Sequence, residues 1–154
     1  MQIYQSLMDR LRNQHEAISN MVEGLDEKRL AVHPEPERWS IHDNIAHLAK
    51  YQPVFMERIN AILTLDEPTF NAYRAEYDPD FETWRKWDTP NLLGKLDSDR
   101  REIFDMITGL SSEELARAGI HKKRGRLSVV DWTELFVLHE AHHMYTIFQL
   151  VHAA

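Results

Sequence analysis

Residues 128–151 read SVVDWTELFVLHEAHHMYTIFQLV, and this stretch decides the predicted fold. At the helical pitch of about 100° per residue, its apolar side chains share one stripe with two histidines. The stripe consists of Trp132, Leu135, His139, His143 and Leu150. Burying two imidazoles is costly unless they are hydrogen-bonded, hydrated or bound to a metal ion that takes both rings in the neutral form. The stretch therefore predicts a long helix whose inner face carries a candidate metal site.

Composition narrows the chemistry available to this site. The 154-residue chain has nine histidines and no cysteine, so disulfides, thiolate ligands and a cysteine nucleophile are excluded, and histidine and carboxylate are left as ligands. A net charge of −7 argues against a nucleic-acid partner. The basic run HKKRGR at 121–126 is expected to be a solvated loop or hairpin.

The chain shows neither a membrane span nor a secretory leader. No apolar run approaches the roughly 20 residues that cross a bilayer. The first residues, MQIYQSLMDRL, form an amphipathic pattern without the basic start and apolar centre of a signal peptide. We therefore expect a cytoplasmic protein that folds as one domain over residues 1–154.

Three further helical patterns precede the last one. Apolar residues at helical spacing predict helices over residues 2–23 and 41–63, and Pro53 is expected to kink or break the second of them. Thr89 as N-cap, followed by Pro90, opens a third helix that ends at Gly109. With almost no alternating strand pattern, the economical architecture is an all-α four-helix bundle.

Residues 64–88 interrupt the helical periodicity and are rich in acidic and aromatic side chains. A connection of this length inside a compact domain is commonly functional or structured on its own. We predict a lid-like crossover with a short helix near residues 80–87, most of whose aromatic side chains cover the core.

The last helix can supply two metal ligands. His139 and His143 are four positions apart and lie over one patch, whereas His142 points about 100° away from His143 and is expected to be exposed or to support the site indirectly. Three protein ligands and an open position are typical of a catalytic zinc site. The third ligand must come from another helix, and His47 is, apart from His15, the only other histidine well inside a long helical pattern.

Two other interpretations compete with this one. HEAHH also fits the H-E-x-x-H helix of zinc proteases, with Glu140 as general base. However, only eleven residues follow His143. In addition, Thr146 and Gln149 stand where the extended motif needs Gly and His. Alternatively, no metal binds and the histidines are hydrogen-bonded to carboxylates such as Glu140 or Asp43. The remaining histidines are predicted to be surface or loop residues; these are His15, His33, His42, His121 and His152.

Three motifs together resemble the DinB-like superfamily. They are WSIHDNIAHL at 39–48, the G-x-x-S-x-x-D helix entry from Gly125 to Asp131, and HEAHH at 139–143. The resemblance implies a four-helix bundle of up-down-down-up connectivity, with a long crossover between the second and third helices, commonly assembled as a homodimer. It also implies a divalent metal held by His47, His139 and His143.

Relatives in that superfamily include bacillithiol S-transferases and mycothiol-dependent maleylpyruvate isomerase. The resemblance therefore implies a metal-dependent enzyme acting on a small molecule, with zinc or nickel as the ion and a low-molecular-weight thiol as a further cofactor. A thiol S-transferase and a hydrolase would share this site. The alternative is a non-catalytic, metal-stabilised bundle that serves as a binding or interaction module.

Overall fold

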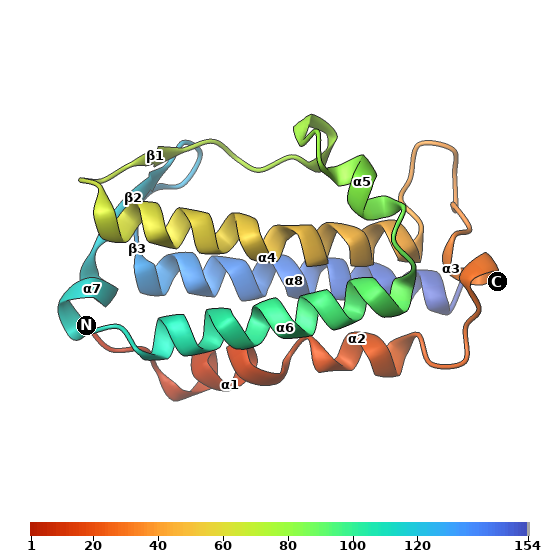
Figure 1. Cartoon of the computed structure of the whole chain (residues 1–154), viewed down its shortest axis with the longest axis horizontal. Coiled ribbons are helices and arrows are strands. Elements are labelled where there is room, and N and C mark those ends of the chain that lie inside the picture. The colour runs from red at the N-terminus through yellow and green to blue at the C-terminus, as the bar shows by residue number, and fades with distance from the viewer. Residues whose placement is uncertain (154) are drawn as a thin grey trace.

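The computed structural model describes residues 1–153, and its four long helical segments pack side by side (Figure 1). The chain runs in one direction through α1 (Gln5–Asn13) and α2 (Glu16–Met21) and returns along α4 (Ile41–Thr64). A long crossover then carries the chain back to the end of the bundle where α4 begins. As a result, α6 (Thr89–Thr108) runs parallel to α4, and α8 (Val129–Val151) runs opposite to both (Figure 1). This is the predicted up-down-down-up four-helix bundle.

The first segment is two helices, not the single helix predicted over residues 2–23. An irregular turn separates them at Gln14 and His15. The Gln14 amide donates to the carbonyl of Val137 on α8, and Nε2 of His15 lies 3.0 Å from the carboxylate of Asp97 on α6. In a regular helix, the side chains of neighbouring residues point about 100° apart. The turn therefore lets the side chains of Gln14 and His15 both reach polar groups of the bundle. The short helix α3 (Glu27–Leu30) follows, capped by Asp26.

Helix α4 begins where the sequence predicts and ends within one residue of the predicted end. Ser40 and Asp43 form a reciprocal capping box, in which each side chain bonds to the backbone N–H of the other. The helix continues through Pro53 to Thr64, so the expected break does not occur. Its partner α8 opens with the same device, a capping box made by Ser128 and Asp131.

The crossover contains a short strand, a single 3-10 turn and a short helix. These are β1 (Thr69–Phe70), η1 (Ala75–Tyr77) and α5 (Phe81–Arg85), and α5 lies in the interval 80–87 where a helix was predicted. The cap of α6 is Asp88, whose carboxylate accepts the backbone N–H of Asn91, and not Thr89 as the sequence suggested. Thr89 instead bonds through its hydroxyl to Glu27.

A small three-stranded sheet covers one end of the bundle. After α7 (Ser112–Ala116), the strands β2 (Ala118–His121) and β3 (Gly125–Ser128) form an antiparallel hairpin, and β1 pairs with β2 in parallel. The basic run HKKRGR at 121–126 forms the turn of this hairpin and the adjoining ends of its two strands. The sheet lies close to α4. A Cβ atom placed on Gly119 of β2 would come within 2.9 Å of the Ile62 side chain of α4.

Apolar side chains fill the bundle along its whole length. Two buried clusters run from the sheet end, around Trp132 and Phe136, to the opposite end, around Ile45 and Leu96. Burial of each such side chain contributes about 1.5–3 kcal/mol. No helix within residues 1–153 combines the length and apolar character required to cross a membrane.

Candidate metal centre

Antiparallel packing of α4 against α8 brings together the three predicted histidines. Nε2 of His47 lies 3.0 Å from Nε2 of His139, and the rings of His47 and His143 are 4.5 Å apart between centroids. One nitrogen of each ring falls within 4.8 Å of the others. The structure therefore places His47 beside the i, i+4 pair on α8, although 92 residues separate it from His139 in sequence.

All three imidazoles are held in the neutral form that metal ligation needs. Burial, together with the neighbouring rings of His143 and His139, lowers the pKa of His47 to about 2. The same desolvation lowers the pKa of His139 to about 4 and that of His143 to about 3. At neutral pH each ring keeps one nitrogen lone pair available.

The spacing of the ring nitrogens in the cluster fits a shared cation. Within residues 1–153, Nδ1 of His47 and Nδ1 of His139 are buried without a hydrogen-bond partner. Two nitrogens bound to one zinc ion at about 2.0–2.1 Å lie about 3–3.4 Å apart, which matches the observed 3.0 Å separation.

Asn44 supports the third ring. Its amide Oδ1 lies 2.8 Å from Nδ1 of His143, so Nδ1 carries the proton and donates, and the Nε2 lone pair of His143 stays free. Such a partner on the outer nitrogen is the usual arrangement behind a metal-ligating histidine. Sequence reasoning missed Asn44, although its position three residues before His47 on the same helix places it one turn away.

A cavity of about 630 Å³ opens onto the triad. Trp39 lies 5.0 Å from His47 and 5.9 Å from His143 between ring centroids, and Tyr73 stacks on His47 at 5.7 Å. The crossover forms the remaining wall with residues 73–77, which belong to the segment predicted to cover the mouth. The wall is therefore aromatic beside the triad, and Glu37, Arg74 and Glu76 add charged groups to the lining.

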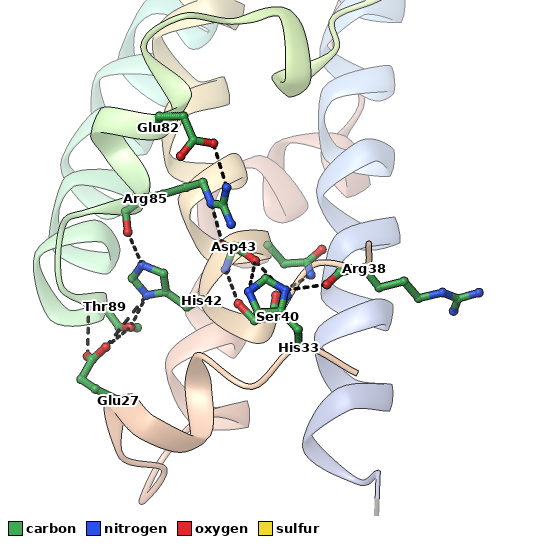
Figure 2. Close-up of polar contacts among 10 residues, drawn as sticks. Glu27, His33, Arg38, Ser40, His42, Asp43, Glu82, Arg85 and Thr89 are labelled. Atoms are coloured by element: carbon green, nitrogen blue, oxygen red, sulfur yellow. Dashed lines mark hydrogen bonds and ion pairs between the residues drawn. The ribbon is translucent and has the colours of Figure 1, made fainter. Parts of the chain in front are cut away.

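The carboxylates suggested as alternative partners are engaged elsewhere. Asp43 accepts hydrogen bonds from the backbone of Ser40 and the guanidinium of Arg85, and Nε2 of His33 lies 3.5 Å away (Figure 2). Glu140 forms a buried ion pair with Arg100 of α6, and both side chains are only 1% exposed. Neither carboxylate is therefore the partner of the triad, and Glu140 does not occupy the general-base position of a zinc protease.

The histidines outside the triad differ in exposure. His142 is exposed, as expected, whereas His15 and His121 are buried, contrary to the prediction that they are surface or loop residues. His15 faces Asp97 inside the bundle, and His121 packs against Trp132 beneath the hairpin. His42 is half-buried and bonds to the Arg85 carbonyl and the Thr89 hydroxyl (Figure 2). None of the four belongs to the cluster of possible metal ligands found within residues 1–153.

Fold and site together define an up-down-down-up helical bundle with a histidine triad that could hold a divalent metal ion. The DinB superfamily matches residues 10–147, which covers most of the chain. The protein belongs to the DinB superfamily.

Two solved structures from Bacillus subtilis share this fold. YfiT, described as "a probable metal-dependent hydrolase with an unusual four-helix bundle topology", is 18% identical with a TM-score of 0.81, over 97% of this chain and 88% of YfiT. A DinB-like protein is 16% identical with a TM-score of 0.63, over 96% of this chain and 90% of its own. No curated protein matches the sequence.

Proposed function

We propose that His47, His139 and His143 bind one divalent metal ion, zinc or nickel, and that the protein is a metal-dependent enzyme acting on a small molecule. The observation that carries the proposal is the convergence of three neutral imidazoles from two helices at the base of an open cavity. Three protein ligands leave coordination positions for water or substrate, which favours catalysis over the non-catalytic, metal-stabilised module.

A divalent ion at this position would supply Lewis acidity and lower the pKa of bound water or thiol. The residues of the chain have separate tasks around it. Asn44 orients the His143 ring, while Trp39 and Tyr73 pack against the imidazoles of His143 and His47. Glu37 and Glu76 are the carboxylates that line the cavity, so they are the candidates to accept a proton from the nucleophile.

Hydrolysis is the version that we favour, because YfiT, which has the same fold, is described as a probable metal-dependent hydrolase. Transfer of a low-molecular-weight thiol to an electrophile would use the same triad. The two reactions are separated by assaying the purified protein with model esters and, in parallel, with bacillithiol and a model electrophile. Metal-dependent ester hydrolysis without metal-dependent conjugation would support the hydrolase.

Metal analysis tests the site itself. Protein purified without a nickel column should contain about one zinc or nickel ion per chain, and His139→Asn should remove it. His142→Asn is the matched control, because this neighbouring histidine is exposed and lies outside the triad. Equal metal content in both variants, or none in the wild type after incubation with zinc and nickel, would contradict the proposal.

We also propose that the chain forms a homodimer, as the family resemblance implies. Tyr145 and Phe148 are at least half exposed along α8, and an association through this part of the helix would cover them. Sedimentation equilibrium of the wild type and of a Tyr145→Lys, Phe148→Lys double variant tests this assembly.

A further inference from the structure

A second cavity, of about 500 Å³, lies beside the one that opens onto the triad. The two cavities share Tyr73 and His139 in their walls, so a ligand in the second cavity would reach one of the proposed metal ligands. Tyr51 also lines the second cavity, with its ring centroid 4.6 Å from that of His139. The basic hairpin between β2 and β3 forms the outer wall.

The charges around this second cavity all have the same sign. Arg58 from α4 and Lys123 and Arg124 from the hairpin line it, and no acidic residue within residues 1–153 does. None of these three cations takes part in an ion pair with the described part of the chain, whereas Arg126 on the same hairpin pairs with Glu67. In a protein with a net charge of −7, such a grouping concentrates positive potential at one opening.

Two lining residues are held in place by the scaffold. Arg58 donates a hydrogen bond to the carbonyl of Asn71 and lies over the rings of Phe70 and Trp132, at 5.5 and 5.7 Å. His121 is 6% exposed, and its Nδ1 accepts the backbone N–H of Lys123. The neutral His121 ring therefore carries its proton on Nε2, which is a hydrogen-bond donor. A guanidinium and an imidazole N–H fixed in this way are suited to bind an anion.

The positive potential also acts on the histidines. The pKa of His121 is lowered by burial and then by the nearby charges of Arg124 and Arg58. Arg58 also contributes to the lowered pKa of His139. Arg58 therefore contributes to the electrostatic environment of both the second cavity and the triad.

We propose that the second cavity binds the carboxylate or phosphate group of a small-molecule substrate whose reactive bond lies at the histidine triad. The placement of the reactive bond at the triad rests on the proposed function. Binding of the anion itself does not require a metal. A basic run on a surface is commonly just solvated. Here the run is folded against a cavity that lacks acidic groups and adjoins the candidate metal centre.

Anion binding is the direct test. Inorganic phosphate and adipate are titrated at low ionic strength into metal-free and metal-loaded protein by isothermal calorimetry, which separates phosphate from carboxylate recognition. The double variant Lys123→Gln, Arg124→Gln should raise the Kd of the preferred anion about tenfold. Lys122→Gln is the control, because this exposed lysine of the same hairpin does not line the cavity and should leave the Kd unchanged.

A pair of esters then tests the link to the reaction. Mono-4-nitrophenyl adipate carries a carboxylate and 4-nitrophenyl butyrate does not. The wild type should show the lower KM for the charged ester, and the double variant should lose this preference while its metal content stays the same. Lys122→Gln should keep both the preference and the kcat of the wild type.

The outcomes separate the two proposals. Metal-dependent hydrolysis with no preference for the charged ester, no anion binding and no effect of the double variant overturns the anion subsite and leaves the proposed function standing. Anion binding that depends on Lys123 and Arg124 in a protein that binds no metal supports the subsite and overturns the proposed function. Binding of a short oligonucleotide in preference to both small anions overturns the small-molecule assignment.

Discussion

Asn44 shows at the scale of one residue how a side chain that is not itself a candidate ligand can control the candidate metal centre. Its Oδ1 fixes which nitrogen of His143 is protonated, and its Nδ2 donates to the carbonyl of Ser40. Both the ring and the amide are thereby tied to the start of α4.

Asn44→Ala should weaken zinc binding about 10- to 100-fold, because His143 loses the partner that orients its ring. Competition with a zinc chelator measures the affinity. Asn44→Asp keeps an acceptor at this position and should restore most of the binding. Equal affinity of the alanine variant and the wild type would show that the bond to Asn44 has no role in ligation.

Arg100 and Glu140 form a second buried polar unit at this scale. Arg100 also bonds to Gln52 and to the Leu11 carbonyl, and lies 4.7 Å over the Phe136 ring. Four helical segments therefore meet at one guanidinium.

Glu140→Ala should lower the free energy of unfolding by about 3–5 kcal/mol, because it leaves the Arg100 charge buried without its counter-ion. Glu134→Ala on the same helix is the control. It breaks the partly exposed pair with Arg10, which should cost about 0–1 kcal/mol. Urea denaturation measures the free energy of unfolding of both variants. Similar losses in the two variants would contradict the claim that burial makes the Arg100–Glu140 pair costly to break.

At the scale of elements, the position of the sheet depends on a close approach between β2 and α4. Gly119 lies against Ile62 and Phe70, whereas Gly94 on α6 has no atom within 4 Å of the place where a Cβ would be. The two glycines therefore differ in environment although neither has a positive φ.

Gly119→Ala should destabilise the protein by about 1–3 kcal/mol, because the added methyl group overpacks the contact between sheet and helix. Gly94→Ala should instead stabilise it by about 0.5–1 kcal/mol through the higher helix propensity of alanine. Thermal unfolding of the two variants gives the comparison. A stabilising effect at Gly119 would show that the sheet can move away from α4 at little cost.

At the scale of the whole molecule, the burial of three neutral histidines makes stability depend on pH. The pKa of each ring is lower in the folded protein than the ordinary value of 6.5. Below pH 6.5 the unfolded chain therefore binds more protons than the folded one, and stability falls as the pH decreases towards the folded pKa values.

Metal-free protein should accordingly lose stability between pH 6.5 and 4.5, by up to about 1.4 kcal/mol per pH unit for each buried ring. His143→Gln should reduce this slope by the share of one ring, and His152→Gln, which removes an exposed histidine outside the triad, should leave it unchanged. Denaturant unfolding across this pH range measures the slope. The carboxylate of Asp43, whose pKa is also lowered, contributes in the same direction only at still lower pH.

The sequence by itself determined the three long helices α4, α6 and α8, the starts of α4 and α8, and the pairing of His139 with His143, because these features depend on residues within about four positions of one another. Only the tertiary structure decided that His47 meets this pair, that Gln14 and His15 break the first helix, and that Arg100 pairs with Glu140. The tertiary structure also decided that the basic run lies in a hairpin beside the candidate site. Such contacts join segments 40 to 126 residues apart, and their geometry follows from the packing of whole helices and not from any local pattern.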